Sequence, residues 1–185
     1  MIAAVLVLNA VSVGAWQQKC DFMTGGGWIV FHGAKANFGV GGGCKNGSPT
    51  WGHLEYLDHG MGLNVHWTSI TAYFPYGTDT GPAPQTGQPT GARFICGTAT
   101  TNLYGNVNFV VLARDAGEPG VNDTFDIRLK NLLGVTVYDT TTECEFHYLG
   151  SPVPCSPGTG GGGNIQLHKP NPSTTGDFGG SCPAL

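Results

Sequence analysis

The sequence is poor in charge and has no cluster of basic residues. Only 11% of the 185 residues are charged, and eight Lys and Arg stand against twelve Asp and Glu, so that the formal net charge is −4. A nucleic-acid surface needs grouped cations to neutralise phosphates. The composition therefore predicts that nucleic acid is not a partner.

Long helices are also missing. From Trp28 onward there is no sustained apolar stripe with the spacing of a helix, and the chain contains 31 Gly and 12 Pro. Both residue types are unfavourable inside helices. This composition points to short strands joined by many turns.

The one long apolar stretch, residues 1–15, is too short to span a bilayer. It ends in Val13-Gly14-Ala15, small residues of the kind that signal peptidase accepts. The segment lacks the basic residues with which a signal peptide usually begins, and a start codon further upstream would explain their absence. We expect residues 1–15 to be a signal peptide; a first β-strand is the alternative. Residues 16–185 are then a single secreted or cell-surface domain without a membrane span, with an extended tail at 170–185.

The six cysteines include no C-x-x-C pair that would suggest zinc. An even number of widely spaced cysteines behind a signal peptide predicts three disulfides in an oxidising compartment; six reduced thiols are the alternative. Sequence alone leaves fifteen pairings open. The best local pair is Cys144 with Cys155, because the short segment between them contains two prolines. The other four are Cys20, Cys44, Cys96 and Cys182, of which Cys20 and Cys182 would fix terminal segments that otherwise lack apolar anchors.

A clear strand pattern follows the turn-rich segment 115–123. Phe125, Ile127 and Leu129 alternate with polar residues, which is typical of a half-buried strand. The pattern predicts an all-β fold: a β-sandwich of about nine short strands with jelly-roll or Ig-like Greek-key connections, stapled by disulfides. The expected strands are 28–31, 35–40, 51–57, 63–74, 92–101, 106–114, 124–130, 135–138 and 164–169, and the expected loops include 41–49, 75–91 and 140–157.

Four segments, in this order and at this spacing, resemble the "post-choice-of-anchor" type β-domain of exported bacterial proteins. They are Thr24-Gly25-Gly26-Gly27-Trp28-Ile29, 36–40 with 52–60, Gly117-Glu118-Pro119-Gly120 with 122–125, and 161–169. Each is weak alone, and together they cover roughly residues 24–170. The resemblance implies a secreted or surface-displayed all-β module and assigns no reaction. The six cysteines and the insertion at 140–157 depart from it.

Four carboxylates lie close together in the sequence at Asp115, Glu118, Asp123 and Asp126. Oxygen ligands on a glycine-rich loop suit Ca²⁺, so Asp115, Glu118 and Asp123 are a candidate calcium site. The alternative is that Asp115 and Asp123 cap turns while Glu118 and Asp126 face solvent. No D-x-D-x-D-G loop is present.

Aromatic residues are candidates for a carbohydrate platform. The set is Trp28, Trp51, Trp67 and Tyr56. The alternative is that they belong to the core, as most tryptophans of a β-sandwich do.

Candidate catalytic groups are sparse. The nearest carboxylate pair is Glu55 with Asp58, and the nearest hydroxyl–imidazole pair is Ser69 with His66. There is no G-x-S-x-G elbow. His53, His59 and His66 fit no metal signature, and structural hydrogen bonds are the preferred interpretation.

Together these patterns predict a non-enzymatic secreted or surface β-module with a structural or adhesive role. The expected partners are further copies of the chain, as an oligomer or filament, or surface glycans. A carbohydrate-binding module and a small secreted hydrolase are the alternatives.

Overall fold

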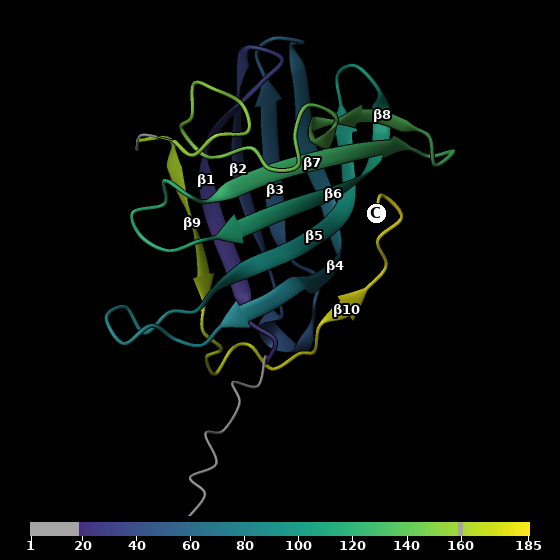
Figure 1. Ribbon diagram of the computed structural model, residues 1–185. Helices are drawn as coiled ribbons and strands as arrows, with labels where there is room; N and C mark the ends of the chain where they lie inside the picture. Colours follow the sequence, from purple (N-terminus) through teal and green to yellow (C-terminus); the bar gives the residue numbers. More distant parts are fainter. Residues whose placement is uncertain (1–18, 159–160) are drawn as a thin grey trace, which may run out of the picture.

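The computed structural model describes residues 19–158 and 161–185, which form an all-β protein (Figure 1). The expected signal peptide at 1–15 lies outside the described residues. The strands are β1 (Phe22–Phe31), β2 (Ala34–Gly43), β3 (Trp51–Asp58), β4 (Leu63–Thr80), β5 (Thr90–Thr101), β6 (Gly105–Asp115), β7 (Thr124–Asn131), β8 (Thr136–Asp139), β9 (Gly163–His168) and β10 (Gly179–Gly180). Two 3-10 turns are η1 (Lys45–Gly47) and η2 (Thr140–Thr142). Within this part of the chain, no helix has the length and apolarity needed to cross a membrane.

The strands form one antiparallel sheet in the order β8-β7-β6-β5-β4-β3-β2-β1-β9, with β10 paired to β4. The all-β, disulfide-containing fold is confirmed. The Greek-key connections are wrong, since each of the first eight strands pairs with its neighbour in sequence. Short turns explain part of this order: β1 and β2 are joined only by His32 and Gly33, both at positive φ, and β5 and β6 only by residues 102–104, which leaves no chain to reach a distant strand.

The sheet folds over on itself into two layers (Figure 1). Strands β4 to β8 lie across the front, β1, β2 and β3 run steeply behind them, and β9 lies beside β1 at the left edge. The 18-residue β4 belongs to both layers: it pairs with β3 at one end and with β5 along most of its length. Its register against β5 shifts between Trp67 and Ser69 and between Ile70 and Ala72. Such bulges bend a strand, which allows the sheet to turn the corner.

The core lies between the two layers. Phe125, Ile127 and Leu129 of β7 are at most 1% exposed, which confirms the predicted facing of this strand. The Phe38 ring from the back layer stacks on Phe125 with centroids 3.9 Å apart. Alternate residues of two other strands are also buried: Val107, Phe109 and Val111 of β6, and Ile165 and Leu167 of β9.

Two predicted loops are partly strand. β4 continues through Pro75 to Thr80, and β2 includes Gly41 to Gly43. In the back layer, glycine allows close contact between chain segments: a Cβ on Gly27 would lie 2.2 Å from the carbonyl oxygen of Gly162. Glycine, which the sequence pattern assigns to turns, serves close strand packing here.

A buried ion cluster joins three elements at one end of the molecule. Arg93 of β5, with no exposed surface, donates hydrogen bonds to Asp21 before β1 and to Asp79 of β4. The Tyr73 hydroxyl donates to the same Asp21 at 2.6 Å. Burial alone would lower the pKa of Arg93, but the hydrogen bonds to both carboxylates raise it, so the guanidinium stays charged. Sequence reasoning missed this cluster.

All six cysteines are paired, as predicted. The disulfides are Cys20–Cys44, Cys96–Cys182 and Cys144–Cys155, and the last is the local pair expected from the sequence. Cys96–Cys182 and the pairing of β10 with β4 hold the C-terminal tail against the front layer.

Candidate functional site

The outer face of the back layer carries a shallow hollow beside Trp28. Strand periodicity places Trp28, Asn37 and Leu57 side by side on this face, while Ile29, Phe38 and Tyr56 point into the core. The hollow has a volume of about 520 Å³. Its lining includes Trp28, Asn37, Gly39, Glu55, Leu57, Asn64 and Gly161 to Gly163.

Gly39 keeps the floor of this hollow open. Nothing lies within 4 Å of the position that a Cβ on Gly39 would take, and its neighbour across β1 is another glycine, Gly26. A side chain at Gly39 would therefore fit the fold and project into the hollow.

Polar side chains line the hollow at Asn37, Glu55 and Asn64, and some of them bond to neighbours outside it. The carboxylate of Glu55 accepts from the imidazole of His66 at 2.5 Å, and both side chains are at least half exposed. The Asn37 carbonyl oxygen lies 2.8 Å from the Nε2 atom of His59. Lys35 places its ammonium 4.2 Å from the centre of the Trp28 ring. The hollow thus combines an aromatic wall with hydrogen-bond donors and acceptors.

The structure separates the four aromatic residues of the predicted platform. Trp28 lines the hollow, whereas Trp51 packs edge-on to Phe22 under the ammonium of Lys45. Trp67 packs against the core. Tyr56 is 2% exposed, so including it in an exposed platform was wrong. Strand parity explains the error, because Tyr56 alternates with the outward-facing Glu55 and Leu57.

Tyr56 belongs instead to a buried hydrogen-bond chain. Its hydroxyl lies 2.6 Å from that of Tyr138, which donates to the Asp58 carboxylate at 2.8 Å. Burial, more than any other cause, raises the pKa of both tyrosines. Both hydroxyls therefore stay protonated and act as structural donors.

The candidate catalytic pairs are not assembled. Glu55 and Asp58 are three residues apart on one strand, so Glu55 points outward and Asp58 is buried. His66 pairs with Glu55, while the Ser69 hydroxyl lies 2.7 Å from that of Thr98. The hydrolase alternative lacks both of its proposed constellations.

The acidic segment closes the free edge of β9. The Asp115 carboxylate accepts from the backbone amide of Leu167 at 2.7 Å, and that of Asp123 accepts from Ile165 at 2.8 Å. Glu118 accepts from the side chain of Asn164. The oxygens of the candidate calcium ligands thus already accept hydrogen bonds from N–H donors that hold β9. Residues 19–158 and 161–185 contain no cluster of three or more metal-ligating side chains.

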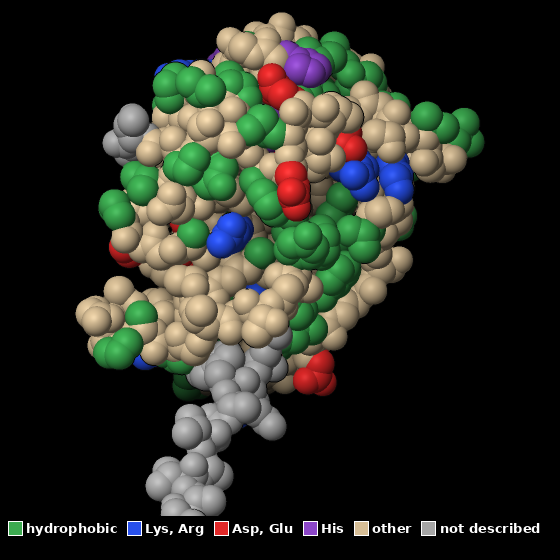
Figure 2. Space-filling model, viewed as in Figure 1, with side chains coloured by type: hydrophobic (Ala, Val, Ile, Leu, Met, Phe, Trp, Pro, Cys, Tyr) green, Lys and Arg blue, Asp and Glu red, His purple; other side chains and the backbone are tan. Residues whose placement is uncertain are grey.

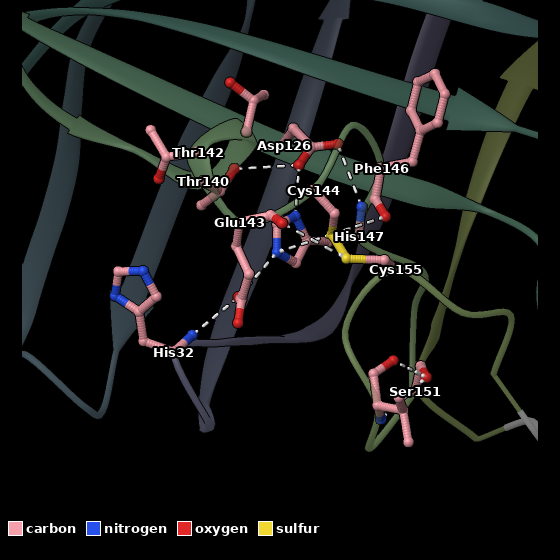
Figure 3. Close-up of polar contacts among 12 residues, drawn as sticks. His32, Asp126, Thr140, Thr142, Glu143, Cys144, Phe146, His147, Ser151 and Cys155 are labelled. Atoms are coloured by element: carbon pink, nitrogen blue, oxygen red, sulfur yellow. Dashed lines mark hydrogen bonds and ion pairs between the residues drawn. A yellow bond between two sulfur atoms is a disulfide. The ribbon is translucent and has the colours of Figure 1, made fainter.

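A buried Asp126–His147 pair lies beneath segment 140–157 (Figure 3). The imidazole Nδ1 atom is 2.7 Å from Asp126, and Thr140 donates to the same carboxylate. The expectation that Asp126 faces solvent is wrong, because this segment packs over the outer face of β7 and leaves the residue 1% exposed. Sequence reasoning missed the pair, since its members are 21 positions apart and belong to no motif.

No hydroxyl of the residues labelled in Figure 3 is bonded to the other imidazole nitrogen, and that of Thr140 donates to Asp126. Figure 3 shows Ser151 well away from His147, and its hydroxyl donates to the carbonyl of Val153. The other imidazole nitrogen faces Glu143 at 3.4 Å and the sulfur of Cys144 at 3.5 Å. The pair therefore faces a disulfide, not a serine or threonine nucleophile.

A second hollow, more apolar, lies on the front face. In Figure 2, hydrophobic side chains gather over β5 and β6, and a hollow of about 410 Å³ is found there. Tyr76, Phe94, Leu112, Phe146 and Leu185 contribute its apolar lining, and Arg128 and Glu145 its charges.

Comparison of the chain with protein-family models, with curated proteins and with solved structures finds no match.

Proposed function

We propose that this protein is a non-enzymatic secreted or cell-surface β-module that adheres to carbohydrate through the hollow beside Trp28. The observation that carries the proposal is the lining of that hollow: one indole wall, a floor without side chains at Gly39, and a polar rim. Ligand sites typically combine apolar surface with a few converging polar groups.

The chemistry of the hollow suits a sugar ring. Ring carbons of a hexose present C–H groups that pack against an indole face, and the hydroxyls require both donors and acceptors. Asn37 and Asn64 can supply both, and Glu55 supplies acceptors. The hollow is shallow, which fits a terminal sugar or a short stretch of chain at a surface.

The proposed location rests on the cysteines and on the resemblance to exported domains. Three disulfides, with no free cysteine among the described residues, suit an oxidising environment. The expected leader at 1–15 and the resemblance of residues 24–170 point the same way.

A glycan array tests the proposed function. We expect the purified chain to bind a subset of glycans, and Gly39→Val, which would fill the hollow, to lose those signals. The matched control is Asn106→Val, which places the same side chain at an exposed position of β6. Equal signals from Gly39→Val and the control would rule out this hollow as the glycan site.

Self-assembly is the second candidate function, because the molecule carries both an apolar projection and an apolar hollow. Leu132, Leu133 and Val135, in the turn between β7 and β8, are 69%, 88% and 56% exposed. Inserting this turn into the front hollow of the next copy would be a head-to-tail contact, which builds open chains. Sedimentation at increasing protein concentration tests this candidate.

A further inference from the structure

The Cys144–Cys155 disulfide is the most accessible of the three. Cys155 is exposed and Cys144 half-buried, whereas Cys20 and Cys44 are both at most 6% exposed, and the third disulfide joins the fully buried Cys96 to the half-buried Cys182. Thiol–disulfide exchange requires an incoming thiolate to reach one of the two sulfurs. Cys155 offers such a sulfur at the protein surface.

The sulfur of Cys144 lies beside a histidine with a fixed orientation. Asp126 holds Nδ1 of His147 at 2.7 Å, so that Nε2 faces Cys144 Sγ at 3.5 Å (Figure 3). The side chains of His147 and Asp126 are 1% and 2% exposed. The imidazole is therefore aimed at one sulfur of the disulfide and not at the other.

The surroundings of His147 favour its charged form. Burial lowers the pKa of this imidazole. Asp126 of β7 and Glu143, which follows η2, raise the pKa by more than burial lowers it, so the net shift is upward. The neighbours from β1 are the Phe31 ring and the backbone amide of His32, which donates to Glu143. In the imidazolium form, Nε2 carries a proton that faces the Cys144 sulfur and Glu143.

We propose that Cys144–Cys155 is a thiol–disulfide exchange site at which low-molecular-weight thiols react. The external thiolate attacks Sγ of Cys155 and forms a new S–S bond with it. The Cys144–Cys155 bond breaks, and its electron pair leaves on Cys144 as a thiolate. The imidazolium of His147 stabilises that thiolate through Nε2–H. In the reverse direction, the Cys144 thiolate attacks the mixed disulfide and expels the thiol.

This site is separate from the proposed glycan hollow. It lies on segment 140–157, over the outer face of β7, and next to Phe146, which lines the front hollow. A thiol joined to Cys155 would thus be attached covalently at the front face of the module. Loss of glycan binding in the Gly39→Val variant leaves this inference untouched.

Partial reduction with glutathione tests the site directly. The full chain is treated at pH 7, quenched by alkylation at intervals and mapped by mass spectrometry. We expect Cys155 to form the mixed disulfide first, and Cys144–Cys155 to open at least about tenfold faster than the other two disulfides. Earlier opening of Cys96–Cys182 or Cys20–Cys44 would overturn the proposal.

Two variants distinguish the contribution of His147 to the exchange rate from that of the exposure of the disulfide. In His147→Gln, exchange at Cys155 should slow by roughly three- to tenfold, because the departing thiolate loses its stabilising partner. His53→Gln, which changes an exposed histidine of β3 outside both proposed sites, is the control and should react like the parent. An unchanged rate in His147→Gln contradicts the assignment.

A measurement that leaves His147 intact covers the case in which His147→Gln does not fold. In Cys155→Ser, Cys144 is a free thiol, and its alkylation rate against pH reports its ionisation. We expect the thiol pKa of Cys144 to lie below the usual value of about 8.5. A value at or above 8.5 would show that His147 does not stabilise the thiolate.

Discussion

The carboxylate of Asp123 accepts a hydrogen bond from the backbone amide of Ile165 at 2.8 Å. It thereby supplies the acceptor that the backbone of a neighbouring strand would otherwise provide to β9. Its other oxygen accepts from the amide of Ala116 at 2.9 Å. Asp115 repeats the arrangement two residues further along β9, at Leu167. An edge that would otherwise present free N–H groups is thereby closed.

Removing this carboxylate should destabilise the protein. Asp123→Ala leaves the amides of Ala116 and Ile165 without their acceptor, and we expect a loss of roughly 2–4 kcal/mol in the free energy of unfolding. Urea denaturation measures the loss. Glu118→Gln, at an exposed neighbour, is the control and should stay within about 0.5 kcal/mol of the parent. A parent-like Asp123→Ala would mean that these bonds contribute nothing.

Stability should also depend on pH through the same residue. Burial, opposed by hydrogen bonds from the amides of Ala116 and Ile165, raises the pKa of Asp123 to about 6. The usual value of about 3.9 applies to the unfolded chain. The folded protein therefore holds a proton that the unfolded chain has released, and the stability due to this proton is lost as pH rises from about 4 to about 6.

Asp123→Asn isolates this effect, because it cannot titrate. Unfolding free energies of the parent and of Asp123→Asn are compared at several pH values from 4 to 7. We expect the difference between them to change in favour of the variant as pH rises. A difference that is constant over this range would show that Asp123 has the same pKa in the folded and in the unfolded chain.

The stacked pair across the core gives a third prediction. Phe125→Ala removes the ring that packs on Phe38, and should lower the free energy of unfolding by roughly 3–5 kcal/mol. Thermal or chemical denaturation measures this change. A melting temperature within error of the parent would mean that β7 does not face the core.

The exposed turn between β7 and β8 gives a prediction for assembly. Leu133→Asp should abolish concentration-dependent association without lowering stability, because the side chain is 88% exposed. Leu103→Asp, at a 48% exposed leucine in the turn before β6, is the matched control. Sedimentation velocity distinguishes the variants; association that persists in Leu133→Asp excludes this turn as the contact.

Local patterns predicted much of the fold. The alternation of Phe125, Ile127 and Leu129 has the period of a strand, so its buried face could be identified directly. The Cys144–Cys155 pair was also predictable, because its loop is short. The burial of Asp126 was not, since it depends on the path of segment 140–157 across β7, a tertiary contact without a local signal.

The candidate site was predictable only in part. Trp28 was singled out by its residue type, but Gly39, which leaves the floor open, looks like any other glycine in a chain rich in them. Parity along β3 could have excluded Tyr56, because Glu55 and Leu57 share the opposite face. That the hollow contains Asn64 depends on the pairing of β3 with β4, which the sequence does not specify.

The measurement that tests the central claim most directly is calorimetric titration of the best glycan from the array into the parent, Gly39→Val and Asn106→Val. Gly39→Val should fold at least as stably as the parent, because replacing glycine inside a strand gains about 0.5–1 kcal/mol. Its affinity for the glycan should nevertheless fall by at least about tenfold, or 1.4 kcal/mol, while Asn106→Val binds like the parent. Undiminished affinity in a folded Gly39→Val would contradict the assignment of the hollow beside Trp28 as the carbohydrate site.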